Sequence, residues 1–236
     1  MDIISELKAH TDERIADLLR ANLMSDEFVK FMKENLKKYQ EMICYYQCAI
    51  MEVETKFKVL NEQFSLRYDN NPIESIRTRV KSWDSLLEKL HRKNIPLDID
   101  EIQEKITDIA GVRIVCSFPE DIYTLAESFC RQDDVTVLEI KDYCKNPKPN
   151  GYRSLHLIIS VPIFLENEKR NVMVEVQIRT IAMDFWASLE HKLNYKKDIS
   201  PEAQTKLKAE LLECAEISAE LDLKMQRIRS NLTPNN

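Results

Sequence analysis

In the segment Val172-Met173-Val174-Glu175-Val176-Gln177-Ile178-Arg179, polar side chains occupy every second position from Glu175 onwards. Its even-numbered residues are apolar, whereas Glu175, Gln177 and Arg179 share the opposite face. Such alternation is typical of a β-strand that buries one face and leaves the other open. The sequence therefore predicts a strand over 171–179 whose open face carries a carboxylate, an amide and a guanidinium.

Four more strands are expected before this one, and helices are expected around all five. The strands cover residues 76–81, 112–118, 135–141 and 154–161. Elsewhere apolar residues recur every three or four positions, which is the period of a helix. These segments predict helices over 2–23, over 26–67, from the Ser82 cap to Lys93, from Pro119 onwards, over 180–192 and over 201–230. The helix over 26–67 is too long for a small domain to cover, so we expect it to pack against another subunit or the C-terminal helix. The expected class is α+β or mixed α/β.

The strand over 76–81 has one basic face, because Arg77, Arg79 and Lys81 alternate with Ile76, Thr78 and Val80. Three cations on one sheet face repel one another unless an anion lies there, so the pattern favours an anionic ligand over a solvated surface. If the strands are neighbours, one face of the sheet gathers Arg79, Lys81, Arg113, His156, Glu175 and Gln177, with Asp108 close to it.

Composition excludes several classes of protein. The chain has 236 residues, 34 Lys and Arg against 40 Asp and Glu, and a formal charge of −6. Its two glycines, Gly111 and Gly151, are too few for a dinucleotide fingerprint or a P-loop. Its six cysteines form no C-x-x-C pair, which argues against structural zinc. No apolar run is long enough to span a membrane, so no membrane partner is expected. The acidic, amphipathic N-terminus does not resemble a signal peptide, so a reducing cytoplasmic location is expected.

Two basic clusters stand out on this acidic chain. Residues 76–93 hold six basic and two acidic residues, for a net +4, and residues 141–153 hold four basic and one acidic, for a net +3. Local cation clusters of this size favour small anionic ligands over a long polyanion. With Asp108 and Glu175 among the cations, they fit a nucleotide site that includes Mg²⁺, which prefers oxygen ligands.

Several strings of residues resemble the synthetase domain of the RelA/SpoT family over roughly residues 70–200. They are Arg79-Val80-Lys81, Asp108-Ile109-Ala110-Gly111-Val112-Arg113, Asp142-Tyr143, residues 146–156 from Asn146-Pro147-Lys148 to His156, Val174-Glu175-Val176-Gln177-Ile178-Arg179-Thr180 and residues 182–191. The resemblance implies a nucleotidyltransferase-like mixed sheet. It also divides the chain into a helical extension (1–70), a synthetase domain (71–198) and a C-terminal helix (199–236) that packs on the core or on a neighbouring subunit.

The resemblance implies that ATP gives its β,γ-pyrophosphate to the 3′-hydroxyl of GDP or GTP, and possibly of GMP. The products are AMP and (p)ppGpp, an alarmone of the stringent response. By the same resemblance Glu175 is the general base, and Asp108 with Glu175 holds Mg²⁺. The ATP residues implied are Arg79, Lys81, Lys89, Arg92 and Arg113. The GDP/GTP residues implied are Lys141, Lys148, Tyr152, His156, Gln177, Asp184 and Glu190.

Small synthetases of this family tend to form homotetramers through terminal helices, so a homo-oligomer is expected, with an allosteric nucleotide or RNA left open. Two alternatives compete with the enzyme. One is a catalytically silent nucleotide- or RNA-binding regulator on the same scaffold, which would need the cations but not both carboxylates. The other is a helical scaffold without a site, which the basic strand face argues against.

Overall fold

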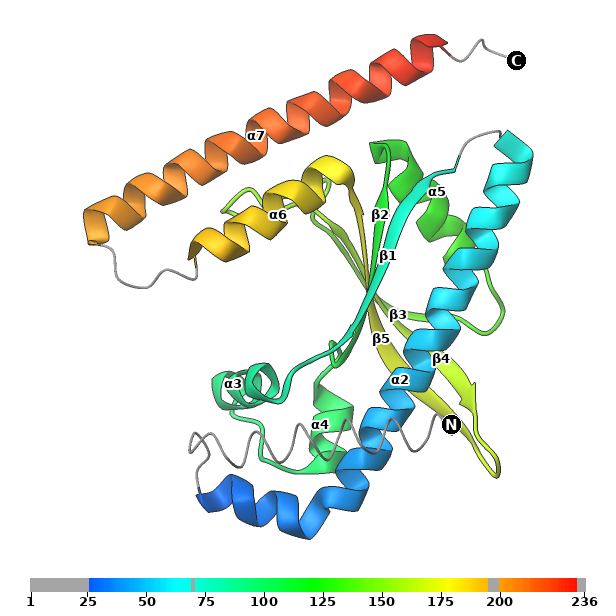
Figure 1. Cartoon of the computed structure of the whole chain (residues 1–236), viewed down its shortest axis with the longest axis vertical. Helices are drawn as coiled ribbons and strands as arrows, with labels where there is room; N and C mark the ends of the chain where they lie inside the picture. The colour runs from blue at the N-terminus through cyan, green and yellow to red at the C-terminus, as the bar shows by residue number, and fades with distance from the viewer. Residues whose placement is uncertain (1–25, 69–70, 195–199, 233–236) are drawn as a thin grey trace, which may run out of the picture.

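The computed structural model describes residues 26–68, 71–194 and 200–232. The helix predicted over 2–23 lies outside these residues. Figure 1 shows a twisted sheet with helices on both sides. The elements are α2 (Asp26–Tyr68), β1 (Ile73–Val80), α3 (Trp83–Lys93), α4 (Ile99–Lys105), β2 (Ala110–Cys116), α5 (Pro119–Cys130), β3 (Thr136–Asp142), β4 (Leu155–Phe164), β5 (Lys169–Thr180), α6 (Ile181–Asn194) and α7 (Pro201–Leu232).

The five strands form one mixed sheet in the order β1-β2-β5-β4-β3. Strands β2 and β5 pair in parallel at the centre, and the other three pairings are antiparallel. The α+β class and the five predicted strands are therefore confirmed, with strand ends displaced by a few residues. Strand β5 lies in the middle of the sheet, so the polar residues of its open face reach neighbours on both sides.

Local signals set the helix ends. The Ser82 side chain accepts a hydrogen bond from the Ser85 amide and caps α3, as the sequence predicted. Pro119 is the first residue of α5, where its missing N–H costs nothing. Helix α4 was not predicted, because its seven residues are too few for a clear period. Its signal was Asp98, whose carboxylate accepts from the amides of Asp100 and Glu101.

Helix α2 covers one face of the sheet. Its residues Met42, Ala49, Val53 and Phe57 are fully buried, at the spacing of a single helix face. The Phe57 ring stacks on that of Phe129 in α5, with ring centroids 4.4 Å apart. The sequence had suggested another subunit or the C-terminal helix as the partner of this helix. Instead, the sheet and α5 bury its apolar face.

The opposite face of the sheet lies between two helices. Figure 1 shows α3 near one end of the strands and α6 near the other, with α7 lying along α6. Trp186 of α6 packs with Leu211 and Ala215 of α7 in a second, small core, and its indole N–H donates to the Leu211 carbonyl at 2.8 Å. None of the helices that the structure describes has the length and apolar content of a membrane span.

Gly151 shows how closely the loop between β3 and β4 approaches α7. Its φ is +88°, in the region that favours glycine, and a Cβ there would lie 2.5 Å from the Cβ of Ala215. The loop that carries Lys148 and Tyr152 is therefore held against α7, which fixes it at one end of the open sheet face.

The packing of α2 makes a direct prediction. Phe57→Ala should lower the free energy of unfolding by about 3–5 kcal/mol, because it removes a fully buried ring. Val59→Ala is the matched control, since Val59 is two residues away on the exposed side of α2 and should change stability by less than about 0.5 kcal/mol. Urea unfolding followed by circular dichroism measures both. Equal effects of the two substitutions would contradict the packing of α2 on the sheet.

Candidate active site

One row of side chains crosses the whole sheet on its open face. In register from β1 to β3, the row runs Arg77, Arg113, Gln177, His156 and Lys141. The next row contains Arg79, Gly111 and Glu175 on β1, β2 and β5. The pairing thus brings together Arg79, Arg113, His156, Glu175 and Gln177, as the strand alternation predicted, and Lys81 follows β1 directly.

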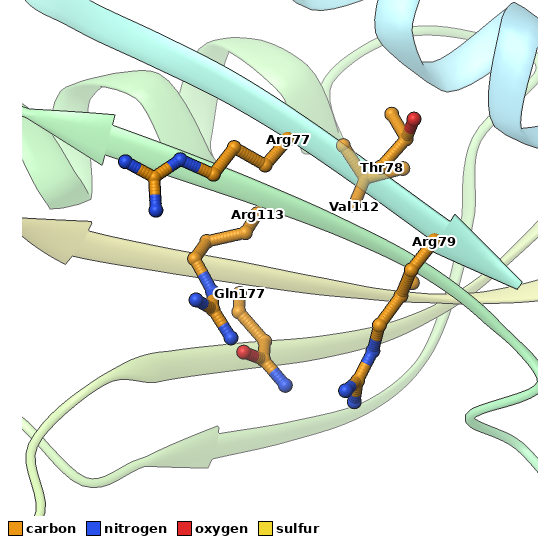
Figure 2. Close-up of a pocket in the computed structure, with 7 residues that line it drawn as sticks. Arg77, Thr78, Arg79, Val112, Arg113 and Gln177 are labelled. Atoms are coloured by element: carbon orange, nitrogen blue, oxygen red, sulfur yellow. The ribbon is translucent and has the colours of Figure 1, made fainter. Parts of the chain in front are cut away.

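At the β1 end, arginines line a cavity of about 110 Å³, with Gln177 also in its wall. Figure 2 shows the side chains of Arg79, Arg113 and Gln177 extending to the same side, whereas Arg77 extends away from Arg79. The Arg79 side chain lies across Gly111, where an added Cβ would contact its Cγ and Nε at 3.4 Å. The Arg113 Nε is buried and has no hydrogen-bond partner among the described residues. This end can hold a flat or anionic group between two guanidinium groups.

Asp108 lies beside this end, between two ammonium groups. Lys81 Nζ is 3.0 Å from its Oδ2, and Lys89 Nζ of α3 is 2.7 Å from its Oδ1. Burial raises the pKa of Asp108, but the hydrogen bonds from Lys89 and Lys81 outweigh it and hold the pKa below its usual value. The carboxylate is therefore ionised at neutral pH. Arg92 is exposed on the same helix as Lys89.

Glu175 occupies the centre of the site. Its Oε1 is 3.2 Å from His156 Nδ1, and its Oε2 accepts a hydrogen bond from Gln177 Nε2 at 2.8 Å. Burial raises the pKa of this carboxyl, but the contacts with His156 and Gln177 outweigh it and hold the pKa below the ordinary value. Glu175 is thus a mostly buried carboxylate that stays ionised and can accept a proton.

The β3 end of the site is aromatic and basic. The rings of Tyr143, Tyr152 and His156 meet edge to face, with centroids 5.2–6.1 Å apart. Lys148 Nζ lies 4.7 Å from the Tyr143 ring and 4.9 Å from the Tyr152 ring. Tyr143 belongs to one of the strings that resemble the RelA/SpoT family, Asp142-Tyr143, but the resemblance implied no role for it. This end offers ring faces for a base and ammonium groups for phosphates.

Three other predicted acceptor residues have protein partners here. Lys141 Nζ lies 2.8 Å from Glu139 on the same strand. Glu190 lies on α6 and accepts a hydrogen bond from Asn150 Nδ2 at 3.1 Å, so it contacts the loop rather than the row of side chains on the sheet. Asp184 is buried beneath the arginine end, where it forms ion pairs with Arg77, Arg113 and Arg179.

Arg179 was predicted to lie on the open face of its strand, but the sequence did not indicate how many site residues it contacts. Only 3% of it is exposed, yet its guanidinium donates to Tyr152, Gln177, Ser154 and Asp184. Its position in the alternation on β5 placed it on the open face. Its partners are up to 27 residues away in the chain, so no local pattern could reveal them.

The donor set fits a magnesium ion that is shared with a substrate. Asp108 and Glu175 are two ionised carboxylates, and the negative charge of Asp108 tends to raise the pKa of Glu175, so the two groups interact across the site. Within the described residues no group of three or more His, Cys, Asp or Glu could hold a metal ion by itself. Mg²⁺ commonly binds through one or two carboxylates and completes its shell with water and phosphate oxygens. A protein cage of the zinc type does not fit these residues.

Comparison with known proteins agrees with this geometry. The family model described as "Region found in RelA / SpoT proteins" matches residues 78–200. GTP pyrophosphokinase YwaC of Bacillus subtilis is 44% identical over 201 residues, which are 85% of this chain and 95% of that protein. GTP pyrophosphokinase YjbM of the same organism is 39% identical, over 83% of this chain and 90% of that protein.

Two solved structures are similar over most of the chain. Small alarmone synthetase 2 from B. subtilis superimposes with a TM-score of 0.74 at 43% identity, covering 83% of this chain and all of that one. Small alarmone synthetase 1 from B. subtilis bound to its product pppGpp gives a TM-score of 0.75 at 39% identity, covering 84% of this chain and 99% of that one. Because the family model matches residues 78–200 and YwaC is 44% identical over 85% of this chain, the chain belongs to the RelA/SpoT family.

Proposed function

We propose that this chain transfers the β,γ-pyrophosphate of ATP to the 3′-hydroxyl of GDP or GTP, releases AMP, and so makes (p)ppGpp in the stringent response. The observation that carries the proposal is the ionised Glu175 carboxylate, which lies between an arginine-lined end and an aromatic end of one sheet face. The named activity of the similar GTP pyrophosphokinases supports it.

The donor nucleotide binds at the β1 end. Arg79 and Arg113 hold the adenine between their planar guanidinium groups, at the cavity that they line. Lys81 and Lys89 are beside Asp108 and can turn to the triphosphate, with Arg92 further along α3. With the donor bound in this way, its β-phosphorus would lie near the row that contains Glu175.

The acceptor binds at the β3 end. Tyr152 stacks on the guanine, and Lys141, Lys148 and His156 contact the 5′-phosphates. Gln177, Asp184 and Glu190 complete the acceptor set as positioning residues, since each already has a hydrogen bond or ion pair in the site or its loop. The 3′-hydroxyl then lies between the acceptor base and Glu175.

The chemical step needs a base and charge stabilisation. Glu175 takes the proton of the 3′-hydroxyl as the oxygen forms a bond to the β-phosphorus. The bond between that phosphorus and the oxygen of the α-phosphate breaks, and AMP leaves with the electron pair. Asp108 and Glu175 are the residues that would hold Mg²⁺, which when bound neutralises charge on the transferred diphosphate.

We propose further that the chain is a homo-oligomer, and specifically a tetramer. Helix α7 carries a stripe of exposed apolar side chains at helical spacing, and α6 carries another. The residues are Ile217, Leu221, Met225, Ile228 and Leu232 on α7 and Ile181, Phe185, Leu189 and Leu193 on α6. Apolar stripes of this extent favour burial against another copy of the chain. Light scattering of the purified protein tests this, and a monomer at all concentrations would contradict it.

The activity itself is tested by product analysis. Purified protein is incubated with ATP, Mg²⁺ and either GMP, GDP or GTP, and the nucleotides are resolved by anion exchange. We expect AMP in a one-to-one ratio with a guanosine product that carries two additional phosphates, and no product in excess chelator. Folded protein that binds ATP but forms no AMP with any acceptor would contradict the enzyme and support the silent regulator instead.

The role of Glu175 predicts a selective loss of rate. Glu175→Gln should lower kcat by at least about 100-fold, because the amide accepts no proton, while the affinity for ATP stays within about twofold. Glu127→Gln is the control, since Glu127 is an exposed carboxylate on α5 that pairs with Arg131. Steady-state kinetics and calorimetric titration with ATP measure the two quantities. Unchanged turnover in Glu175→Gln would exclude this residue as the base.

Tyr152 allows the ring and the hydroxyl to be separated. Tyr152→Ala removes the stacking face and should raise the KM for the acceptor by roughly 10-fold, corresponding to about 1–3 kcal/mol of stacking. Tyr152→Phe keeps the ring and loses only the hydroxyl contacts with His156 and Arg179, so its acceptor KM should rise less. Equal increases in the KM values for ATP and acceptor in the alanine variant would contradict the stacking assignment.

A further inference from the structure

Arg179 is a buried cation at the end of the site near α6. Its Nη2 donates to the Tyr152 hydroxyl and, at 2.8 Å, to the Gln177 side-chain carbonyl, while its Nε donates to Ser154 Oγ at 3.4 Å. A buried guanidinium without a counter-ion is strongly destabilising. Among the described residues the carboxylate paired with it is Asp184, at 3.4 Å from Nη1.

Asp184 is shared among three arginines. Its Oδ1 lies 3.4 Å from Arg179 and 3.2 Å from Arg113, and its Oδ2 lies 3.4 Å from Arg77. The side chain of Asp184 is 9% exposed, so one buried carboxylate faces three positive charges. Arg113 and Arg179 therefore share a single oxygen atom, so a change in the position of one guanidinium alters the strength of the hydrogen bond that the other makes.

Arg113 and Arg179, the two arginines that share this oxygen, contact opposite ends of the proposed site. Arg113 lines the cavity of the donor end, where its Nε has no partner among the described residues. Arg179 donates to the Tyr152 hydroxyl at the acceptor end and to the side-chain carbonyl of Gln177, whose amide N–H donates to Glu175. Asp184 Oδ1 is thus the point at which the donor end and the acceptor end meet.

We propose that Asp184 and Arg179 are positioning residues that couple the two nucleotide sites, a role that rests on the proposed function. A donor nucleotide that engages Arg113 draws it from Asp184 Oδ1, which leaves this oxygen to Arg179. The ion pair between Arg179 and Asp184, which Arg113 no longer shares, then holds the Tyr152 and Gln177 side chains in the position that binds the acceptor. Occupation of the donor site therefore raises the affinity for the acceptor, and by thermodynamic reciprocity the acceptor raises the affinity for the donor by the same factor.

The coupling is measured as a ratio of affinities. Calorimetric titration gives the Kd of GDP for the full chain with Mg²⁺, first alone and then with a saturating ATP analogue whose α,β-bridge is a methylene group. We expect the analogue to tighten GDP binding by about fivefold or more in the wild-type protein, within the range of typical allosteric coupling. Asp184→Asn removes the charge while keeping the shape, and should bring the ratio close to one.

Two further variants guard against a purely structural explanation. Arg179→Lys keeps the positive charge but loses the fork that joins Tyr152, Gln177 and Asp184, so its ratio should also fall towards one. Asp121→Asn is the matched control, because Asp121 is a similarly buried carboxylate that pairs with Arg229 where the first turn of α5 meets α7. Its ratio should equal that of the wild-type protein.

The outcomes separate the inference from the proposed function. A wild-type ratio near one, or a wild-type ratio retained in both Asp184→Asn and Arg179→Lys, overturns the coupling while leaving the enzyme intact. A direct contact between Asp184 and guanine would weaken GDP binding equally with and without the analogue, and that unchanged ratio also overturns it. If the wild-type protein binds neither nucleotide, the proposed function fails and the coupling fails with it.

Discussion

The ionised carboxylate of Glu175 is the constraint on which the rest of the site depends. A mostly buried carboxylate keeps its charge only if hydrogen bonds offset the cost of burial, and His156 and Gln177 supply them from the same sheet face. Gln177 is held in turn by Arg179, and His156 contacts the Tyr152 hydroxyl. The base, its supports and the aromatic end of the site therefore form one hydrogen-bonded unit.

The sheet holds these residues together because one of its faces packs against helices and the other carries the polar side chains of the site. Helices α2 and α5 bury the apolar side chains of the strands on one side. Strand alternation therefore directs the row from Arg77 to Lys141 to the other side. Parallel pairing of β2 with β5 places Arg113 beside Gln177 and Gly111 beside Glu175. The excess of arginine and lysine on this face is unfavourable in isolation, and polyphosphate substrates would relieve it.

Much of this arrangement was predictable from sequence, because strands and caps are local signals. Alternation along β5 predicted which face Glu175 and Gln177 share, and Ser82 and Pro119 predicted where helices begin. Periodicity showed which side of α2 is apolar but not that the sheet would cover it. The three arginines around Asp184 come from β1, β2 and β5, so this ion-pair cluster depends on strand order, which no local pattern specifies.

The most direct test of the account is a crystal structure of the protein with GDP, Mg²⁺ and the α,β-methylene analogue of ATP, which prevents cleavage. We expect the acceptor 3′-hydroxyl within about 3 Å of the Glu175 carboxylate, the distance that proton transfer requires. Adenine should lie between Arg79 and Arg113, and guanine should stack on Tyr152. A 3′-hydroxyl far from Glu175, or the two nucleotides at exchanged ends of the sheet face, would contradict it.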